Sequence, residues 1–161
     1  MSQTTEKEKS GKKPDFVLID ATNMILGRLG ARVAKMLLEG KRVIIVNAEK
    51  AVISGDPQFI IEKYKDIWEI HSRTNPRRGP FHYSRPDLFV KRTIRGMLPW
   101  KKTRGREAYR RLRVYLGVPP EYRKLQPLRF EELDATKRLK CKWIYVGDLL
   151  KHFGWKGIVR Y

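Results

Sequence analysis

The chain has 161 residues, in which 36 lysines and arginines face 17 aspartates and glutamates, a formal net charge of +19 at neutral pH. This length predicts one domain, or one domain with an appended piece, and is sufficient for a hydrophobic core without a disulfide or a structural metal. The single cysteine, Cys141, excludes an internal disulfide and a cysteine-based zinc site, and no apolar run approaches the ~20 residues that a membrane span needs.

The first elements predict a parallel pair of strands. Residues 1–14 are lysine-rich, lack the apolar core of a signal peptide, and are expected to form a disordered basic arm. Residues 16–20 predict a buried strand, a helical stripe of apolar residues predicts a helix over 26–38, and residues 43–46 predict a second strand. Strand, helix and strand within about thirty residues predict a βαβ unit.

A further helix and a long irregular loop follow. Asp56 is placed to cap this helix and Pro57 suits its first position. Five residues are expected to share one face of it: Ile60, Tyr64, Ile67, Trp68 and His71. Residues 72–86 are rich in proline, glycine and arginine, and their length indicates a binding loop.

Proline residues bound two more helices. The first is expected to begin at Pro86 and end before Pro99, and the second is expected over residues 105–112. Three arginines at spacings of four and three are expected to form one row along the second helix: Arg106, Arg110 and Arg113. Arg110, Arg111 and Arg113 are expected to lie in an exposed row.

The remainder predicts an appended piece. Residues 143–146 predict a late strand, and residues 148–153 a short helix closed by Gly154. We therefore expect an α/β domain over residues 15–120 and a C-terminal extension, residues 121–161, packed on the same domain.

The positive charge is concentrated in the middle of the chain. Residues 71–113 carry fourteen basic and two acidic side chains, whereas residues 14–70 carry eight of each. A charge that served solubility alone would be spread more evenly. The first half is therefore expected to be the scaffold and the arginine-rich segment 73–113 to be the binding surface.

This basic segment indicates a polyanion as partner, and nucleic acid fits best. Arginine predominates, which suits bidentate contacts to phosphate, and aromatic residues are interleaved that can stack on unpaired bases. Irregular loops without a known DNA-reading motif favour a folded RNA; an acidic protein or a membrane surface is the alternative. The candidate RNA-binding residues are Arg28, Arg73, Arg77, Arg78, Arg85, Lys91, Arg92, Arg95, Trp100, Lys101, Lys102, Arg104, Arg106, Arg110, Arg111 and Arg113.

No pattern predicts catalysis. Gly27 and Gly30 stand near a helix start but lack the full G-x-G-x-x-G spacing, so no cofactor is expected. The three histidines are scattered and indicate no metal site. Each acidic residue is explained as a cap, a turn former or a partner of a nearby base, and the chain is expected not to be an enzyme.

Four blocks of the sequence are distinctive: IDATNMILGRLGARVAKMLLEGK (19–41), VIIVNAEKAVISG (43–55), NPRRGPFHYSRP (75–86) and IRGMLPWKKTRGREAYRRLRVYLGVP (94–119). In these blocks the sequence resembles the universal large-subunit ribosomal protein L13 family. The short connection between the first helix and the second strand resembles the archaeal members of that family.

This resemblance implies a three-layer α/β/α domain around a short, mostly parallel sheet. It also implies a structural constituent of the large ribosomal subunit, in the cytoplasm, that binds and organises large-subunit rRNA during assembly. The implied partners are rRNA and neighbouring ribosomal proteins, with no cofactor, small-molecule substrate, membrane or second copy of the chain. The RNA-facing positions would be the turn at Arg28, the loop at Arg77 and Arg78, and the stretch from Arg95 to Arg113.

Two other functions remain open. A nucleotide-using α/β enzyme would need a phosphate loop and a catalytic acid or base, and the sequence shows neither. A free RNA- or DNA-binding regulatory protein would have the same electrostatics, so only the family resemblance and co-sedimentation with ribosomes separate it from a ribosomal protein.

Overall fold

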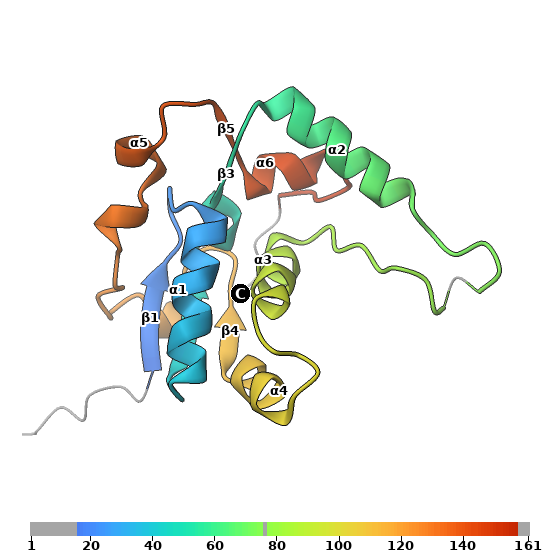
Figure 1. The fold of residues 1–161 in the computed structure, drawn as a ribbon. Coiled ribbons are helices and arrows are strands. Elements are labelled where there is room, and N and C mark those ends of the chain that lie inside the picture. Colours follow the sequence, from blue (N-terminus) through green and yellow to red (C-terminus); the bar gives the residue numbers. More distant parts are fainter. Residues whose placement is uncertain (1–15, 76, 158–161) are drawn as a thin grey trace, which may run out of the picture.

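A computed structural model describes residues 16–75 and 77–157 (Figure 1). The predicted disordered arm lies outside the described residues. The strands are β1 (Phe16–Asp20), β2 (Arg42–Val46), β3 (Val52–Ser54), β4 (Leu112–Val114) and β5 (Trp143–Tyr145). The α-helices are α1 (Leu26–Leu38), α2 (Pro57–Glu69), α3 (Pro86–Gly96), α4 (Thr103–Arg110), α5 (Ala135–Arg138) and α6 (Val146–Lys151). The 3₁₀ turns are η1 (Ala48–Lys50), η2 (Pro120–Tyr122) and η3 (Glu131–Leu133).

A parallel sheet forms the centre of the body. Its strand order is β1-β2-β4, with Val17 opposite Val43 and Ile45 opposite Val114. Helix α1 connects β1 to β2, which confirms the predicted βαβ unit. The strands β3 and β5 form a separate antiparallel pair.

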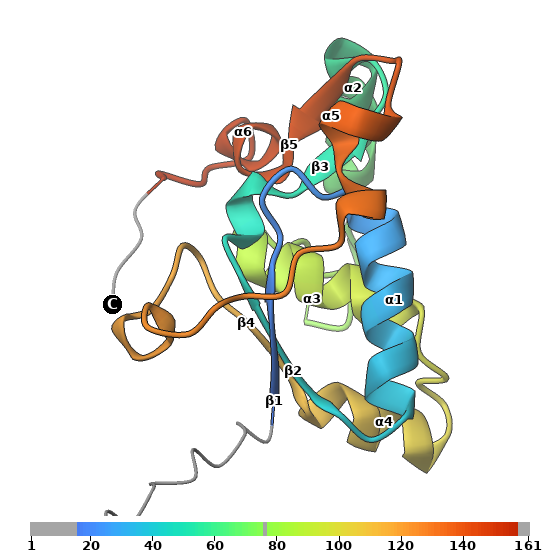
Figure 2. The ribbon, with the colours of Figure 1, turned by 90° about the vertical axis from the view of Figure 1, so that its left-hand side faces the viewer.

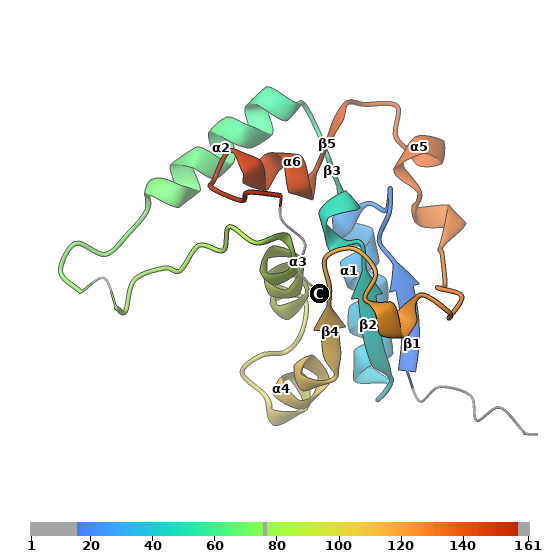
Figure 3. The ribbon, with the colours of Figure 1, turned by 180° about the vertical axis from the view of Figure 1, so that it is seen from behind.

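Both faces of the sheet are covered, as parallel sheets require. Side chains alternate along β2, so Val43 and Ile45 face the helices while Ile44 faces the other side. Figure 2 shows the sheet nearly edge-on, with α1 on one side and the segment around η2 on the other. The side chains of Tyr115 and Tyr122 pack on that second face. Turns therefore form the layer that covers this side of the sheet (Figure 3). The α/β class is confirmed.

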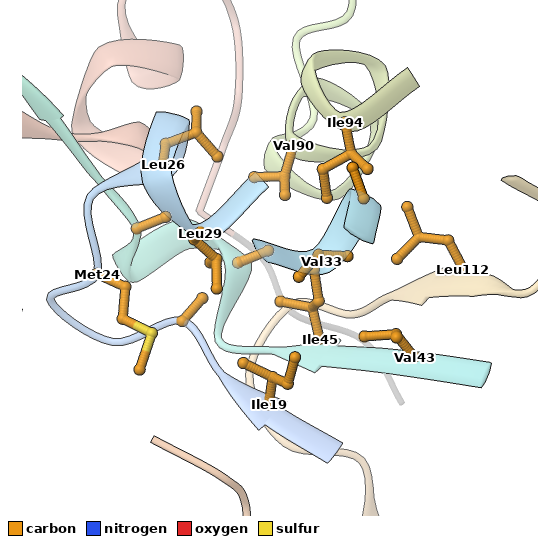
Figure 4. Close-up of a cluster of buried hydrophobic side chains, with 14 of the residues drawn as sticks. Ile19, Met24, Leu26, Leu29, Val33, Val43, Ile45, Val90, Ile94 and Leu112 are labelled. Carbon is orange, nitrogen blue, oxygen red and sulfur yellow. The ribbon is translucent and has the colours of Figure 1, made fainter. Parts of the chain in front are cut away.

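The helix layer is held by a continuous apolar core. Leu29 and Val33 of α1 and Ile94 of α3 are fully buried above β2 (Figure 4). Burying each such side chain contributes about 1.5–3 kcal/mol. A side chain added at Gly30 would lie 2.8 Å from Met97 Sδ, so this glycine allows α1 and α3 to approach closely. Gly30 therefore serves helix packing.

The structure corrects the predicted end of the fourth helix. Helix α4 ends at Arg110, and Leu112–Val114 form β4, which the sequence did not reveal. The backbone leaves the helix because β2 offers partners: Val43 N–H donates to the Arg111 carbonyl at 3.2 Å, and Tyr115 N–H donates to the Ile45 carbonyl at 2.8 Å. Helix α3 likewise ends at Gly96, two residues before the predicted end.

Helix α2 is less buried than predicted. Asp56 caps it, since its carboxylate accepts from Gln58 N–H at 3.0 Å, and Pro57 is its first residue. Ile60 is buried, but Ile67 is 38% exposed, and His71 lies beyond the end of the helix and is exposed. The predicted shared face is therefore only partly correct.

The last part of the chain lies against this body. Strand β5 pairs with β3, with Ile144 opposite Ile53, and Leu149 and Leu150 of α6 are fully buried. The sequence predicted a helix over residues 148–153, and the structure has α6 two residues earlier, at Val146–Lys151. Gly154 lies after this helix, with a φ of +93°. A domain boundary near residue 120 stays a prediction.

Asp20 joins the carboxyl ends of β1 and β2. One of its carboxylate oxygens accepts from Asn47 Nδ2 at 2.9 Å and from the Thr22 hydroxyl at 2.7 Å. Arg129 Nε lies 3.6 Å from the other oxygen. Burial, the largest single influence, raises the pKa of Asp20, but the bonds from Asn47 and Thr22 outweigh it, so that the pKa lies below its usual 3.8.

We expect Asp20→Asn to remove part of the pH dependence of stability. A carboxyl whose pKa is lowered by folding stabilises the fold above its unfolded pKa and loses this contribution as the pH falls through the folded-state value. The free energy of unfolding should therefore fall less steeply below about pH 4 in the variant, which should also be about 1–2 kcal/mol less stable at pH 7. Urea unfolding from pH 7 to pH 3 measures both effects. Glu62→Gln, at an exposed position, is the control; parallel curves for Asp20→Asn and the wild type would contradict the assignment.

Candidate nucleic-acid interface

A ladder of cations and aromatic rings joins α3 to α4. The Arg95 guanidinium carbon lies 4.0 Å from the centroid of the Trp100 ring. Trp100 meets Tyr109 edge-on, with 5.1 Å between centroids and 86° between planes, and Lys91 Nζ lies 5.1 Å from the Tyr109 centroid. Each cation–π contact contributes about 0.5–2 kcal/mol. Together they fix two cations of α3 against the next helix.

Another cation of α3 is held in the same way beside the ladder. The Arg92 guanidinium carbon is 5.6 Å from the centroid of Tyr83, which belongs to the loop before α3. Arg92 itself is exposed. A guanidinium held over a ring keeps N–H groups available for phosphate, and a side chain already held in place loses less entropy on binding.

Backbone packing holds the turn that carries Trp100. Lys102 N–H donates to the Pro99 carbonyl at 3.0 Å, and Leu98 beside it is buried. A side chain at Gly105 would overlap that same carbonyl, so α4 can begin here only with a glycine at this position. Trp100 itself is 36% exposed.

Tyr109 is a member of the interface that sequence reasoning missed. It packs against the core and also contacts Trp100 and Lys91. Burial raises the pKa of Tyr109 above its usual 10.0, although the nearby Arg95 lowers it. The interleaving of aromatic and basic residues was visible in the sequence, but their pairing across the turn was not.

The outer surface of α4 adds exposed cations. Arg106 and Arg110 lie one helical turn apart and are both exposed. Lys101 and Lys102 are exposed at the start of the helix. The ladder, Arg92 and these four residues form one basic surface, which we call the α3–α4 face; its members are Lys91, Arg92, Arg95, Trp100, Lys101, Lys102, Arg106, Tyr109 and Arg110.

Two predicted RNA-binding residues contact the end of α1. Arg111 Nη2 donates to the Leu37 carbonyl at 3.0 Å, and Arg104 Nη2 donates to the Leu38 carbonyl at 3.4 Å. Cations at a helix C-terminus satisfy its free carbonyls and oppose the negative end of its dipole. Arg111 is half-buried, and within the described residues its Nε is the one buried side-chain nitrogen or oxygen without a hydrogen-bond partner. The prediction that it lies in an exposed row was wrong.

Arg113 does not belong to the α3–α4 face either. It belongs to β4 and stands opposite Ile44, whose side chain faces the turn-covered side of the sheet. Successive residues of a strand face opposite sides, so Arg113 points away from the helix layer that Leu112 joins. The predicted row of three arginines is therefore reduced to Arg106 and Arg110.

The remaining candidates are dispersed. Arg28 is exposed at the start of α1, about 15 Å along the helix axis from Leu38 at its end. Arg85 pairs with Asp87 through Nη2 and a carboxylate oxygen at 2.9 Å. Three exposed arginines lie in the loop between α2 and α3, which extends away from the body (Figure 1): Arg73, Arg77 and Arg78.

The described residues hold no group of three or more histidine, cysteine or acidic side chains arranged to bind a metal ion. Within the same part of the chain, no helix combines the length and the apolar character that crossing a membrane would demand. The fold and the α3–α4 face thus define an α/β protein with an arginine-rich surface beside its helix layer.

Comparison with known proteins gives the family. A model of the family described as ribosomal protein L13 matches residues 14–121. The large ribosomal subunit protein uL13 of Archaeoglobus fulgidus is 44% identical over 148 residues, covering 89% of this chain and 91% of that protein. The uL13 of Sulfurisphaera tokodaii is 45% identical over 140 residues, covering 86% and 94%. The chain belongs to the ribosomal protein L13 family, as the four sequence blocks predicted.

We expect Arg111→Ala to destabilise the fold and Arg110→Ala to leave it intact. The first change removes the hydrogen bond that the half-buried, charged guanidinium donates to the end of α1. The free energy of unfolding should fall by about 1–3 kcal/mol. The second removes an exposed side chain and should cost less than about 0.5 kcal/mol. Urea unfolding of the RNA-free protein measures both, and equal stabilities would show that Arg111 has no capping role.

Proposed function

We propose that this protein is a structural constituent of the large ribosomal subunit that binds and organises large-subunit rRNA during assembly. Its membership of the ribosomal protein L13 family carries the proposal, and the relatives named above are large ribosomal subunit proteins. A structural role needs no catalytic site, and rRNA and neighbouring proteins would be its partners within cytoplasmic ribosomes.

The α3–α4 face supports rRNA as the ligand. Its arginines and lysines are exposed or held by rings, and a single acidic residue, Glu107, lies within α4. Closely spaced cations displace the counterions condensed on a polyanion, which supplies affinity without reading sequence. Trp100 is partly exposed and could contact an unstacked base.

The other candidates contribute differently in this proposal. The loop arginines Arg73, Arg77 and Arg78 would reach a second rRNA segment, because the loop extends away from the body. Arg28, at the start of α1, and Arg113, on the turn-covered side of the sheet, would meet RNA on other surfaces than the α3–α4 face. Arg111 and Arg104 would act mainly by fixing α4 against α1.

Sedimentation of a native lysate tests the ribosomal role. On sucrose gradients at moderate and at high salt, we expect the chain to travel with the large subunit and to resist the high-salt wash, because its RNA contacts are buried in the assembly. A chain that stays at the top of both gradients would contradict the proposal and favour a free RNA- or DNA-binding protein.

A double substitution tests the surface. We expect Arg106→Ala with Arg110→Ala to weaken binding to a large-subunit rRNA transcript and to reduce the slope of log affinity against log salt by about 1 for each phosphate that is no longer neutralised. Filter binding between 50 and 200 mM salt measures this slope. Lys63→Ala with Lys65→Ala, two exposed cations of α2, is the matched control; equal losses of affinity in both pairs would show that only net charge matters.

A further inference from the structure

The outward side of α2 carries two highly exposed, large apolar side chains. Phe59 is 66% exposed at its start, and Ile70, directly after its end, is 60% exposed. Both are large apolar side chains, which proteins seldom leave in water without a use when they lie on one surface. Figures 1 and 3 show α2 as the outermost helix of its side of the body.

The opposite side of α2 already has its contacts. Ile60 is buried against Ile144 and Leu149, and Trp68 stacks on Phe153 with 4.5 Å between ring centroids. These contacts fix the rotation of α2 about its axis. Its other face is therefore held outward by the core itself.

Carboxylates lie between the two exposed apolar residues. Spacings of three and four residues place six exposed residues on one outward stripe: Phe59, Glu62, Lys63, Asp66, Glu69 and Ile70. Three of them are carboxylates and one is a lysine, so the stripe is acidic on balance. Within residues 16–75 and 77–157, none of the three carboxylates has a side-chain ion pair or hydrogen bond.

The charge of this stripe argues against RNA as its occupant. The chain as a whole carries a net charge of +19, yet α2 has three carboxylates and two lysines. Phosphates would be repelled by the carboxylates, whereas lysines and arginines of another protein would be attracted. The stripe has apolar residues at its ends and carboxylates at its centre. It therefore suits a protein segment that carries both basic and apolar side chains.

The loop after α2 returns beside the end of the helix. His82 lies 2.9 Å through Nε2 from the Ile70 carbonyl oxygen, and its ring lies 5.3 Å from that of Trp68, between ring centroids. These contacts fix the end of α2 at Ile70. Phe81, the residue before His82, is a further exposed apolar side chain, 57% exposed.

We propose that this stripe docks a basic, apolar-bearing segment of a neighbouring protein of the large ribosomal subunit. Phe59 and Ile70 bury against its apolar side chains, while Glu62, Asp66 and Glu69 pair with its lysines or arginines. The inference rests on the proposed ribosomal role and adds that protein and rRNA are bound on different faces: protein on α2, rRNA on α3 and α4.

Site-directed cross-linking tests the occupant. The exposed Cys141 is first replaced by Ser, so that Asp66→Cys gives a single thiol for a photoactivatable maleimide. The labelled full-length chain is assembled into large subunits, irradiated and analysed by mass spectrometry. We expect a cross-link to a lysine- or arginine-rich peptide of another large-subunit protein. A cross-link to rRNA, to the chain's own peptides or to a second copy, or no cross-link at all, would overturn the inference.

A second labelled position separates this inference from the proposed function. Arg110→Cys in the same background should cross-link to rRNA. If it does while Asp66→Cys does not reach a basic protein, the docking surface is wrong and the ribosomal role stands. If neither labelled chain enters the subunit while both fold, the ribosomal role itself fails.

Apolar substitutions test the energetic contribution of the stripe. Phe59→Ser with Ile70→Ser should leave binding to isolated rRNA unchanged, because neither residue lies on the α3–α4 face. The same pair should reduce the cross-link from Asp66→Cys about tenfold or more, since truncating buried interface anchors commonly has such an effect. An undiminished cross-link would show that these residues do not anchor the partner.

Discussion

The parallel pairing of β2 with β1 and β4 is the constraint on which the rest of the structure depends. A central parallel strand is hydrogen-bonded on both edges and buried on both faces, so every side chain of β2 after Arg42 is buried. One face requires the helix layer, and the other requires the turns that carry Tyr115 and Tyr122. The chain must therefore return to the sheet at β4 soon after α4, and this return fixes where α4 and its cations lie.

Arg111 shows how one side chain serves both the fold and the surface. It stands between α4 and β4, and its guanidinium closes the end of α1 while its backbone carbonyl pairs with Val43. Because α1 is itself fixed on the sheet by Leu29 and Val33, the position of α4 is set from the core outward. The α3–α4 face is thus a surface held by its scaffold, and its aromatic contacts add rigidity to side chains that would otherwise be mobile.

Sequence patterns predicted the elements with strong periodicity and missed those that depend on distant partners. The stripe over residues 26–38 and the apolar run before Asp20 matched α1 and β1, since each pattern follows from one buried face. The strands β3 and β4 were not predicted, and they exist because β5 and β2 offer hydrogen bonds. The basic residues were found from charge alone. In the structure, Arg110 lies on the outer surface, Arg111 caps α1, and Arg113 lies on the opposite face of the sheet. These different positions depend on the pairing of β4 with β2, which could not be seen in the sequence.

The distribution of charge over the folded chain has a physical consequence for assembly. A chain with a uniformly basic surface would bind phosphate in many orientations, because counterion release does not depend on which face is used. A stripe of carboxylates on α2 makes one orientation unfavourable, since it would place like charges together. Under the proposed function the α3–α4 face would make another orientation favourable, because rings already hold Lys91, Arg92 and Arg95, and these cations would lose little freedom on binding. The acidic residues of this basic protein would thus help to orient it on RNA.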